Sequence, residues 1–136
     1  MTGQTVSAAD KRTLTRSYPG QRRQIRLVRT MLTLLLDDCP LVADAVLIAS
    51  ELATNAVLHS NSAAPGGRFA VRAEACLGQY VRIEVHDQGG PWNPHCHEDG
   101  RPHGLDLINA LVGRGNWGIH GDAEHGRTAW AQLDWP

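Results

Sequence analysis

The hydrophobic positions of the chain repeat with a helical period in its first half and mainly with a strand period in its second half. Residues 21–36 carry apolar side chains at steps of three and four, with arginines between them. This pattern predicts an amphipathic helix that ends at the segment 37–40. The same spacing runs from about 41 to 60 and predicts a second helix. A third, shorter helix is predicted to begin near Gly104.

Alternation of apolar and polar residues marks the strands. In residues 80–87, Val81, Ile83 and Val85 fall on one face and the intervening polar side chains fall on the other. Further strands are predicted over 12–18, 68–77, 116–121 and 127–135, with tight turns at 78–79 and 122–126. Because the helices precede most of the strands, we expect an α+β fold: a two-layer sandwich with a mostly antiparallel sheet and helices packed on one face.

Length and charge limit the number of domains and the kinds of partner that are expected. The 136 residues are enough for one hydrophobic core, so we expect a flexible N-terminal arm over 1–11 and a single domain over 12–136. The formal net charge of −1 argues against direct nucleic-acid binding. Seven of the 13 basic residues nevertheless lie before position 30. They form either a solvated flank of the first helix or a partner-binding face.

Cysteine use and hydropathy bear on the compartment. The three cysteines, Cys39, Cys76 and Cys96, are scattered and form no CxxC pair, which is typical of free thiols in a reducing compartment. The first thirty residues contain no apolar stretch typical of a signal peptide, and we expect no membrane span. These features predict a cytoplasmic protein that does not bind a membrane.

One carboxylate interrupts the apolar row of the strand 80–87. Alternation places Asp87 on the same face as Val85, immediately before Gln88 and two glycines. A buried carboxylate without a partner costs several kcal/mol or shifts its pKa instead. Asp87 therefore either caps the following turn or receives its partner from a ligand.

Two further stretches offer polar groups suited to a ligand. Glu51, Asn55 and His59 are spaced by four, so they share one face of the second helix, opposite its apolar arc. That face is either simply solvated or part of a binding site. Gly104 opens a helix, where unpaired backbone N–H groups and the helix dipole favour an anion, although a plain glycine cap has the same pattern. A site for a nucleotide with magnesium requires three kinds of group: a carboxylate acceptor, a neutral amide oxygen and backbone N–H groups that hold the phosphates.

The stretches "ELATNAVLH" (51–59), "HDQGG" (86–90) and "GRPHGLDLI" (100–108) resemble, in order and spacing, three nucleotide-binding boxes of the histidine-kinase-like ATPase superfamily, the Bergerat fold. The resemblance covers roughly residues 12–134. The short chain looks most like the anti-sigma factor serine/threonine kinase branch of that superfamily.

This resemblance implies a role for each matching residue. Asn55 would coordinate Mg²⁺ and Glu51 would be the catalytic base. Asp87 would accept a hydrogen bond from the adenine amino group of ATP, with Gly89 allowing the ring to approach. The remaining implied nucleotide contacts are Arg101, Gly104, Leu105 and Thr128, and residues 90–103 would form a lid. The implied partners are a sigma factor and an antagonist protein, and a homodimer follows only from the resemblance.

The third box departs from the family pattern. Pro102 and His103 stand immediately before Gly104, so the register of Arg101 relative to the helix is altered. A misplaced cation there would leave nucleotide binding intact and weaken phosphoryl transfer. Two hypotheses therefore stay open: a Mg-dependent protein serine/threonine kinase, and a non-catalytic, ATP-gated regulator of a protein partner.

The same segment also carries candidate zinc ligands. His95, Cys96, His97 and His103 are nitrogen and sulfur donors within nine residues. Adjacent ligands in one short loop rarely produce tetrahedral geometry, so a polar lid is the preferred interpretation.

Overall fold

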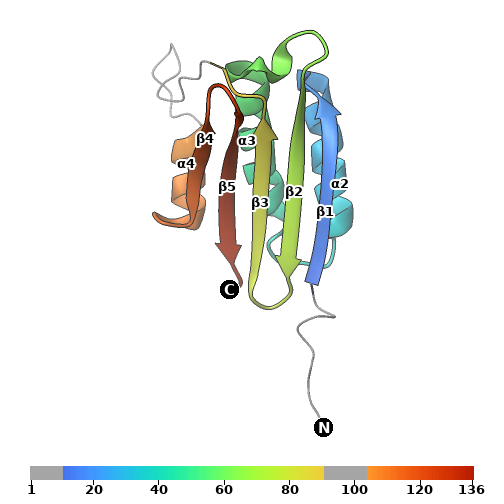
Figure 1. The fold of residues 1–136 in the computed structure, drawn as a ribbon. Helices are drawn as coiled ribbons and strands as arrows, with labels where there is room; N and C mark the ends of the chain where they lie inside the picture. Colours follow the sequence, from blue (N-terminus) through green and yellow to red (C-terminus); the bar gives the residue numbers. More distant parts are fainter. Residues whose placement is uncertain (1–10, 91–103) are drawn as a thin grey trace.

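An antiparallel sheet with helices on one face makes up the computed structural model, which describes residues 11–90 and 104–136 (Figure 1). The strands are β1 (Lys11–Pro19), β2 (Arg68–Cys76), β3 (Tyr80–Asp87), β4 (Trp117–Asp122) and β5 (Gly126–Asp134). The helices are α2 (Ile25–Leu35), α3 (Val42–His59) and α4 (Gly104–Val112), with short 3-10 turns η1 (Arg22–Gln24) and η2 (Asn61–Ala63). The α+β sandwich predicted from the sequence is confirmed.

The sheet has the order β1-β2-β3-β5-β4, and every neighbouring pair is antiparallel. β1 and β4 are therefore its edges. The weak alternation over 12–18 does form an edge strand, which begins at Lys11 and pairs only with β2. The predicted arm is the segment outside the described residues apart from Lys11, and its flexibility stays a prediction.

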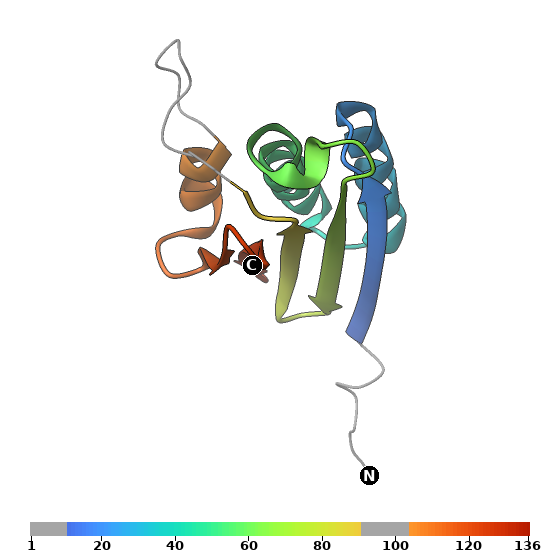
Figure 2. The same ribbon diagram turned by 45° about the horizontal axis from the view of Figure 1, so that its top comes forward.

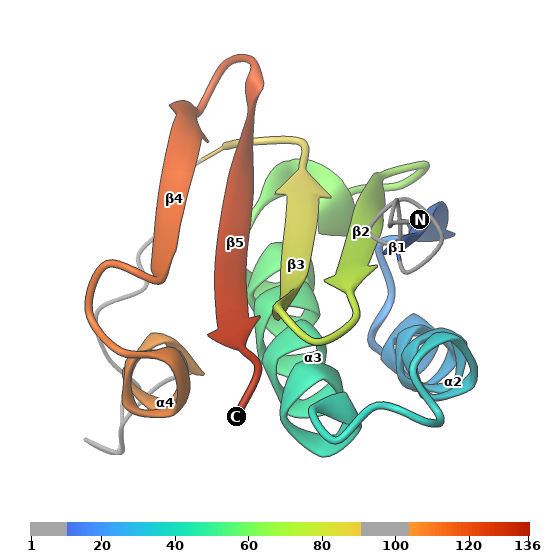
Figure 3. The same ribbon diagram turned by 90° about the horizontal axis from the view of Figure 1, so that it is seen from below.

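The core lies between the sheet and α3, which runs behind β2, β3 and β5 between α2 and α4 (Figure 3). The inward row of β3 consists of Val81, Ile83 and Val85, all at most 2% exposed, and β5 places Ala131 opposite Ile83. Small residues on the inward rows let the helix approach the sheet closely, because a larger side chain would hold the two layers apart. Cys39 and Cys76 are buried free thiols.

Within the described residues, α3 alone is long and apolar enough, by length and composition, to cross a membrane. Its apolar side chains are accounted for by the core. Seven residues of α3 are buried against the sheet and the neighbouring helices.

The first helix begins later than predicted, because residues 22–24 form η1 and regular α-helix starts at Ile25. A bidentate ion pair fixes its other end to the edge strand. Arg12 donates to both carboxylate oxygens of Asp38, at 2.7 and 2.8 Å, and its Nη1 also donates to the carbonyl of Leu35 at 2.9 Å. The end of α2 is thereby held against β1.

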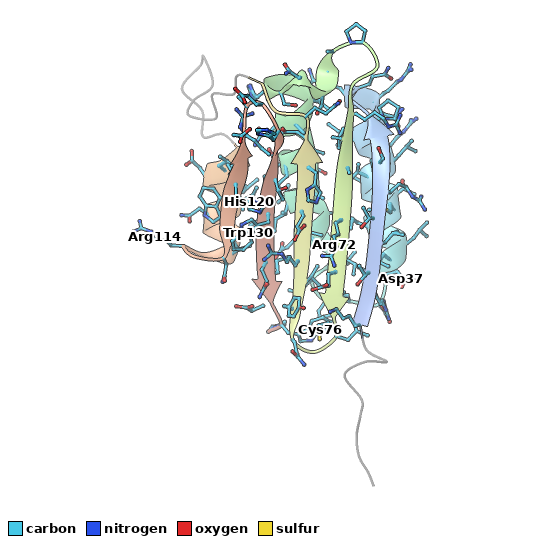
Figure 4. The ribbon with its side chains drawn as sticks, viewed as in Figure 1. Asp37, Arg72, Cys76, Arg114, His120 and Trp130 are labelled. Carbon is cyan, nitrogen blue, oxygen red and sulfur yellow. The ribbon has the colours of Figure 1, made fainter. Side chains whose placement is uncertain are left out.

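The sheet face opposite the helices is polar. Arg72 donates to Glu74 at 3.0 Å, and the Arg82 guanidinium lies 4.3 Å from the ring centroid of Trp130. Arg72 and Trp130 both lie on this face in Figure 4. The first pair lies within β2 and the second joins β3 to β5. Pairs of this kind stabilise a solvated sheet face, and the helices pack on the other face.

Candidate functional site

Four segments that are distant in sequence meet at one end of the sheet. They are the end of β3, the C-terminal end of α3, the start of α4 and the turn between β4 and β5 (Figures 1 and 2). This is where the antiparallel topology brings together the three sequence stretches that predict a nucleotide site. The fold therefore supplies the proximity that sequence spacing alone cannot show.

Asp87 is the last residue of β3, half-buried, and its Oδ1 atom accepts two backbone hydrogen bonds. The donors are the N–H groups of Gly89, at 2.7 Å, and Arg127, at 3.3 Å. Burial raises the pKa of Asp87 above its ordinary value, an effect larger than the lowering by these two bonds and by the Arg127 charge. Asp87 thus caps the turn with one oxygen, while Oδ2 accepts no hydrogen bond from the part of the chain that the structure describes.

The two glycines after Asp87 are held between neighbouring elements. Gly89 accepts a hydrogen bond from the N–H of Asn61 at 2.7 Å, and the N–H of Gly90 donates to the carbonyl of Ala123 at 2.8 Å. Gly89 has φ of 77°, and an added Cβ would lie 2.5 Å from the Ala123 carbonyl oxygen. A side chain at this position would collide with the β4–β5 turn, so glycine is required here.

Ser62 is a site-supporting residue that the sequence did not indicate. It is fully buried, and its Oγ accepts a hydrogen bond from the backbone N–H of Gln88 at 3.0 Å. The backbone N–H of Ser62 donates in turn to Oγ of Ser60 at 3.0 Å. The end of α3 is thereby connected to the end of β3. A serine one turn beyond a helix gives no sequence signal for such a contact, because the partner lies in a different element.

On α3, the polar side chains predicted to share one face lie on its flank. Glu51, Asn55 and His59 are all half-buried, whereas the most exposed large side chains of the helix are Leu47 and Leu58. The expectation that the polar face lies opposite the apolar arc is therefore wrong. Leucines occupy the solvent side, and the polar row lies at the boundary of the core.

The side-chain amide of Asn55 is buried without a partner. Its Nδ2 atom makes no hydrogen bond to any described residue. A buried polar group in this state costs about 1–3 kcal/mol, so it indicates a place where something else binds. Rotation by 180° about the last side-chain bond exchanges Nδ2 with Oδ1, so this amide can also offer an oxygen to a hard cation.

The helix α4 begins at Gly104, as predicted. Leu105 and Ile108 are buried, at 6% and 0% exposed, and they anchor the first turn to the core. Asp106 lies in that first turn, where the helix dipole favours a negative charge. The helix start is thus fixed in place at an end of the helix where the dipole favours an anion.

Thr128 is not brought to this site. It lies opposite His86 in the β3–β5 register, and its Oγ1 is 2.7 Å from Nδ1 of His86 on the polar sheet face. The neighbouring Arg127 lies opposite Asp87 instead, and its Nη2 donates to the carbonyl of Gly90. Arg127 is therefore the β5 residue that contributes to the site, and alternation from Ala129 and Ala131 would have indicated it.

Arg101 and the four candidate zinc ligands lie outside the described residues, as does the predicted lid over 90–103 apart from Gly90. Among residues 11–90 and 104–136, no group of three or more histidine, cysteine or acidic side chains could hold a metal ion.

Comparisons with known proteins agree with this geometry. A family model described as a histidine kinase-like ATPase domain matches residues 18–127. The crystal structure of the RsbU and RsbW domains of Rv1364c from Mycobacterium tuberculosis is similar, with 25% identity and a TM-score of 0.69. That match covers 92% of this chain and 33% of the other, so this chain spans about a third of that protein. Among curated proteins, no sequence matches significantly. The chain belongs to the histidine kinase-like ATPase domain family.

Proposed function

We propose that this protein is an ATP-binding regulator that holds a sigma factor inactive and, as a Mg-dependent serine/threonine kinase, phosphorylates an antagonist protein. The family implies ATP binding. The structural observation that supports a nucleotide site is the buried Nδ2 atom of Asn55, near the C-terminal end of α3, which has no partner among the described residues.

Asp87 is the residue expected to select adenine. Its Oδ1 is engaged by two backbone donors, so Oδ2 is the atom left to accept a hydrogen bond from the exocyclic amine. Guanine presents an oxygen at the corresponding position, which a carboxylate repels, so the site should discriminate against GTP. The absence of a side chain at Gly89 keeps the backbone beside the ring unobstructed.

Asn55 and the start of α4 are expected to hold the phosphates. A magnesium ion, when bound, neutralises charge on the phosphates and polarises the transferred group. The amide oxygen of Asn55 suits that hard cation, and the backbone N–H groups of Gly104 and Leu105 suit the phosphate oxygens. Glu51 lies one turn before Asn55 and would accept the proton of the attacking serine or threonine hydroxyl.

The partners are proposed by resemblance. A sigma factor and an antagonist protein are the partners implied by the anti-sigma factor kinase branch, and the RsbW domain in the similar structure supports that branch. Both partners would be met in the cytoplasm. A homodimer stays a prediction, which sedimentation of the purified protein would test.

A second candidate function is an ATP-gated binding module without phosphoryl transfer. Pro102 and His103 immediately before Gly104 favour it, since they alter the box that would place Arg101. Replacement of Glu51 by Ala separates the two functions. If the variant regulates its partner as well as the wild type does, the kinase function is wrong and the binding module is retained.

Calorimetric titration of ATP, ADP and GTP, with and without Mg²⁺, is the experiment that tests the nucleotide site. We expect adenine nucleotides to bind in a Mg-dependent manner and GTP to bind at least tenfold more weakly, as expected for one lost charged hydrogen bond of about 1.5–3 kcal/mol. A folded protein that binds none of the three would contradict the proposed function.

A further inference from the structure

The groove between α2 and α3 is lined by basic side chains that have no role in the site described above. Its cavity of about 420 Å³ lies at the N-terminal end of α2, and its lining consists of Arg22, Arg23, Ile25, Arg26, Arg29 and Thr54. Arg26 and Arg29 lie three residues apart on α2, and Arg22 lies in η1 immediately before it; all three line the groove together with Thr54 of α3. The result is a concave, strongly cationic surface.

These arginines differ from those of the sheet. On and beside the sheet, Arg12 pairs with Asp38, Arg72 with Glu74 and Arg82 with Glu84. Of the residues described, none forms an ion pair with Arg22, Arg26 or Arg29, and all three are exposed. The whole run from 11 to 36 contains no acidic residue. Repulsion among the guanidinium groups is therefore not offset by a neighbouring carboxylate in this run, and an anionic ligand would reduce it.

Exposed leucines identify the class of molecule that supplies this anion. In the described part of the chain, every exposed large hydrophobic side chain belongs to a helix: Leu27, Leu34, Leu47, Leu58 and Leu107. Leu58 is 49% exposed and lies four residues after Thr54, which lines the groove, so the two share one face of α3. Aliphatic side chains beside cations fit an amphipathic acidic protein segment, whereas free phosphate or duplex nucleic acid would leave the leucine uncovered.

We propose that the groove between α2 and α3 binds an acidic, partly apolar segment of a protein partner. Carboxylates of that segment pair with Arg22, Arg26 and Arg29, and its aliphatic side chains cover Leu58. The same helix carries residues of both sites, because Thr54 lines the groove and precedes Asn55 directly on α3. That such a partner is also the phosphate acceptor rests on the proposed function.

The test is fluorescence anisotropy with a labelled peptide that carries glutamates on one helical face and leucines on the adjacent face. A matched peptide with glutamine in place of glutamate, and a labelled DNA duplex, are titrated in parallel. We expect the acidic peptide to bind, with affinity that falls as salt rises, and the glutamine peptide and the DNA to bind at least tenfold more weakly.

The variants Arg26→Glu and Arg29→Glu are expected to bind the acidic peptide about tenfold or more weakly than the wild type does. Arg114→Glu is the matched control, since Arg114 is exposed in the α4–β4 connection, far from the groove (Figure 4). The variant Leu58→Ser should bind the peptide severalfold more weakly. The variant Leu34→Ser should bind it as the wild type does, because Leu34, the most exposed leucine, lines a different groove between α2 and β1.

Absence of peptide binding to the wild type, equal effects of the groove and control variants, or tighter binding of DNA than of peptide would each overturn the proposal. ATP titrations of the same variants separate this inference from the proposed function. If the wild type binds peptide but no nucleotide, the docking groove stands and the kinase function fails; if it binds nucleotide but no peptide, the reverse holds.

Discussion

The Oδ1 atom of Asp87 and the backbone N–H of Gly89 are joined by a hydrogen bond of 2.7 Å, so the carboxylate that would bind adenine also shapes the glycine turn beside it. The same oxygen receives the N–H of Arg127. Two elements are thus fixed by one atom, and the second oxygen of the carboxylate remains for a ligand. Burial disfavours the ionised form of Asp87 and so raises its pKa, which lowers the stability of the folded protein when this carboxylate is charged.

The substitution Asp87→Asn should therefore stabilise the ligand-free protein and weaken its binding of ATP. A raised pKa in the folded state means that folding disfavours the ionised carboxylate. The penalty is present above the folded pKa, shrinks as the pH falls through it, and is absent below the ordinary pKa. Asparagine keeps the acceptor oxygen without the charge. Thermal unfolding at neutral pH should show a higher Tm for the variant, and the difference should vanish in acid.

Asp122→Asn is the matched control for this prediction. Asp122 accepts bonds from the side chain of His125 and from backbone N–H groups of His125 and Glu124, which lower its pKa. A lowered pKa has the opposite sign, so this variant should lose stability at neutral pH. Equal shifts of the same sign in both variants would contradict the assignment of burial as the cause at Asp87.

Gly89→Ala should destabilise the protein more than Gly78→Ala. Both glycines have positive φ, 77° and 83°, so both variants carry the backbone cost of about 1–2 kcal/mol for an L-residue in that region. Only at Gly89 does the new Cβ approach a carbonyl oxygen, that of Ala123, whereas nothing lies within 4 Å at Gly78. Urea unfolding of the pair measures the difference, and a Gly78 variant as unstable as the Gly89 variant would show that the contact with Ala123 is unimportant.

Asn55→Leu should abolish Mg-dependent ATP binding and leave the ligand-free protein as stable or more stable by about 1 kcal/mol. The reason is that leucine fills a similar volume without burying an unpaired amide. Asn109→Leu is the control on α4, where Oδ1 of Asn109 accepts the Trp117 Nε1–H at 2.8 Å and the variant should lose stability. Calorimetry with and without Mg²⁺, together with urea unfolding, distinguishes the two. A destabilised Asn55 variant would mean that the amide has a structural partner.

Arg12 should control the acid stability of the β1–α2 contact through Asp38. The hydrogen bond from Arg12 lowers the pKa of Asp38 to about 2. A depressed pKa contributes stability above the ordinary value near 3.8, and this contribution is lost as the pH falls towards about 2. NMR titration of the Asp38 carboxyl group should show a midpoint near 2 in the wild type and near the ordinary value in Arg12→Gln. Identical midpoints would show that the ion pair is not formed in solution.

The sequence predicted those features that depend on local periodicity. Alternation predicts the strands, including the edge strand β1, and the order of the three motifs indicates the family that the family model confirms. Asp87 was singled out because one step of strand alternation put a carboxylate in an apolar row. The bounds of α3 differed from the prediction by a single residue at each end.

The remaining features depend on which elements meet. Ser62 reaches the N–H of Gln88 only after α3 and β3 have packed, so no local pattern indicates it. The choice between Arg127 and Thr128 depended on the β3–β5 register, in which a shift of one residue exchanges the two sheet faces. The flank position of Asn55 likewise follows from where α4 packs against α3, which the helical period of α3 does not contain.

The hydrogen bonds of Gly89 with Asn61 and of Gly90 with Ala123 join the strand end to two segments that are far away along the chain. Contacts between distant segments form late in folding, because the intervening loops must close first. The nucleotide pocket is thus completed only when η2 and the β4–β5 turn are both in place. A nascent or partly unfolded chain lacks the pocket and cannot sequester nucleotide, whereas a bound nucleotide draws the population towards the finished fold by mass action. Bound nucleotide is therefore expected to favour those molecules in which both of these contacts have formed.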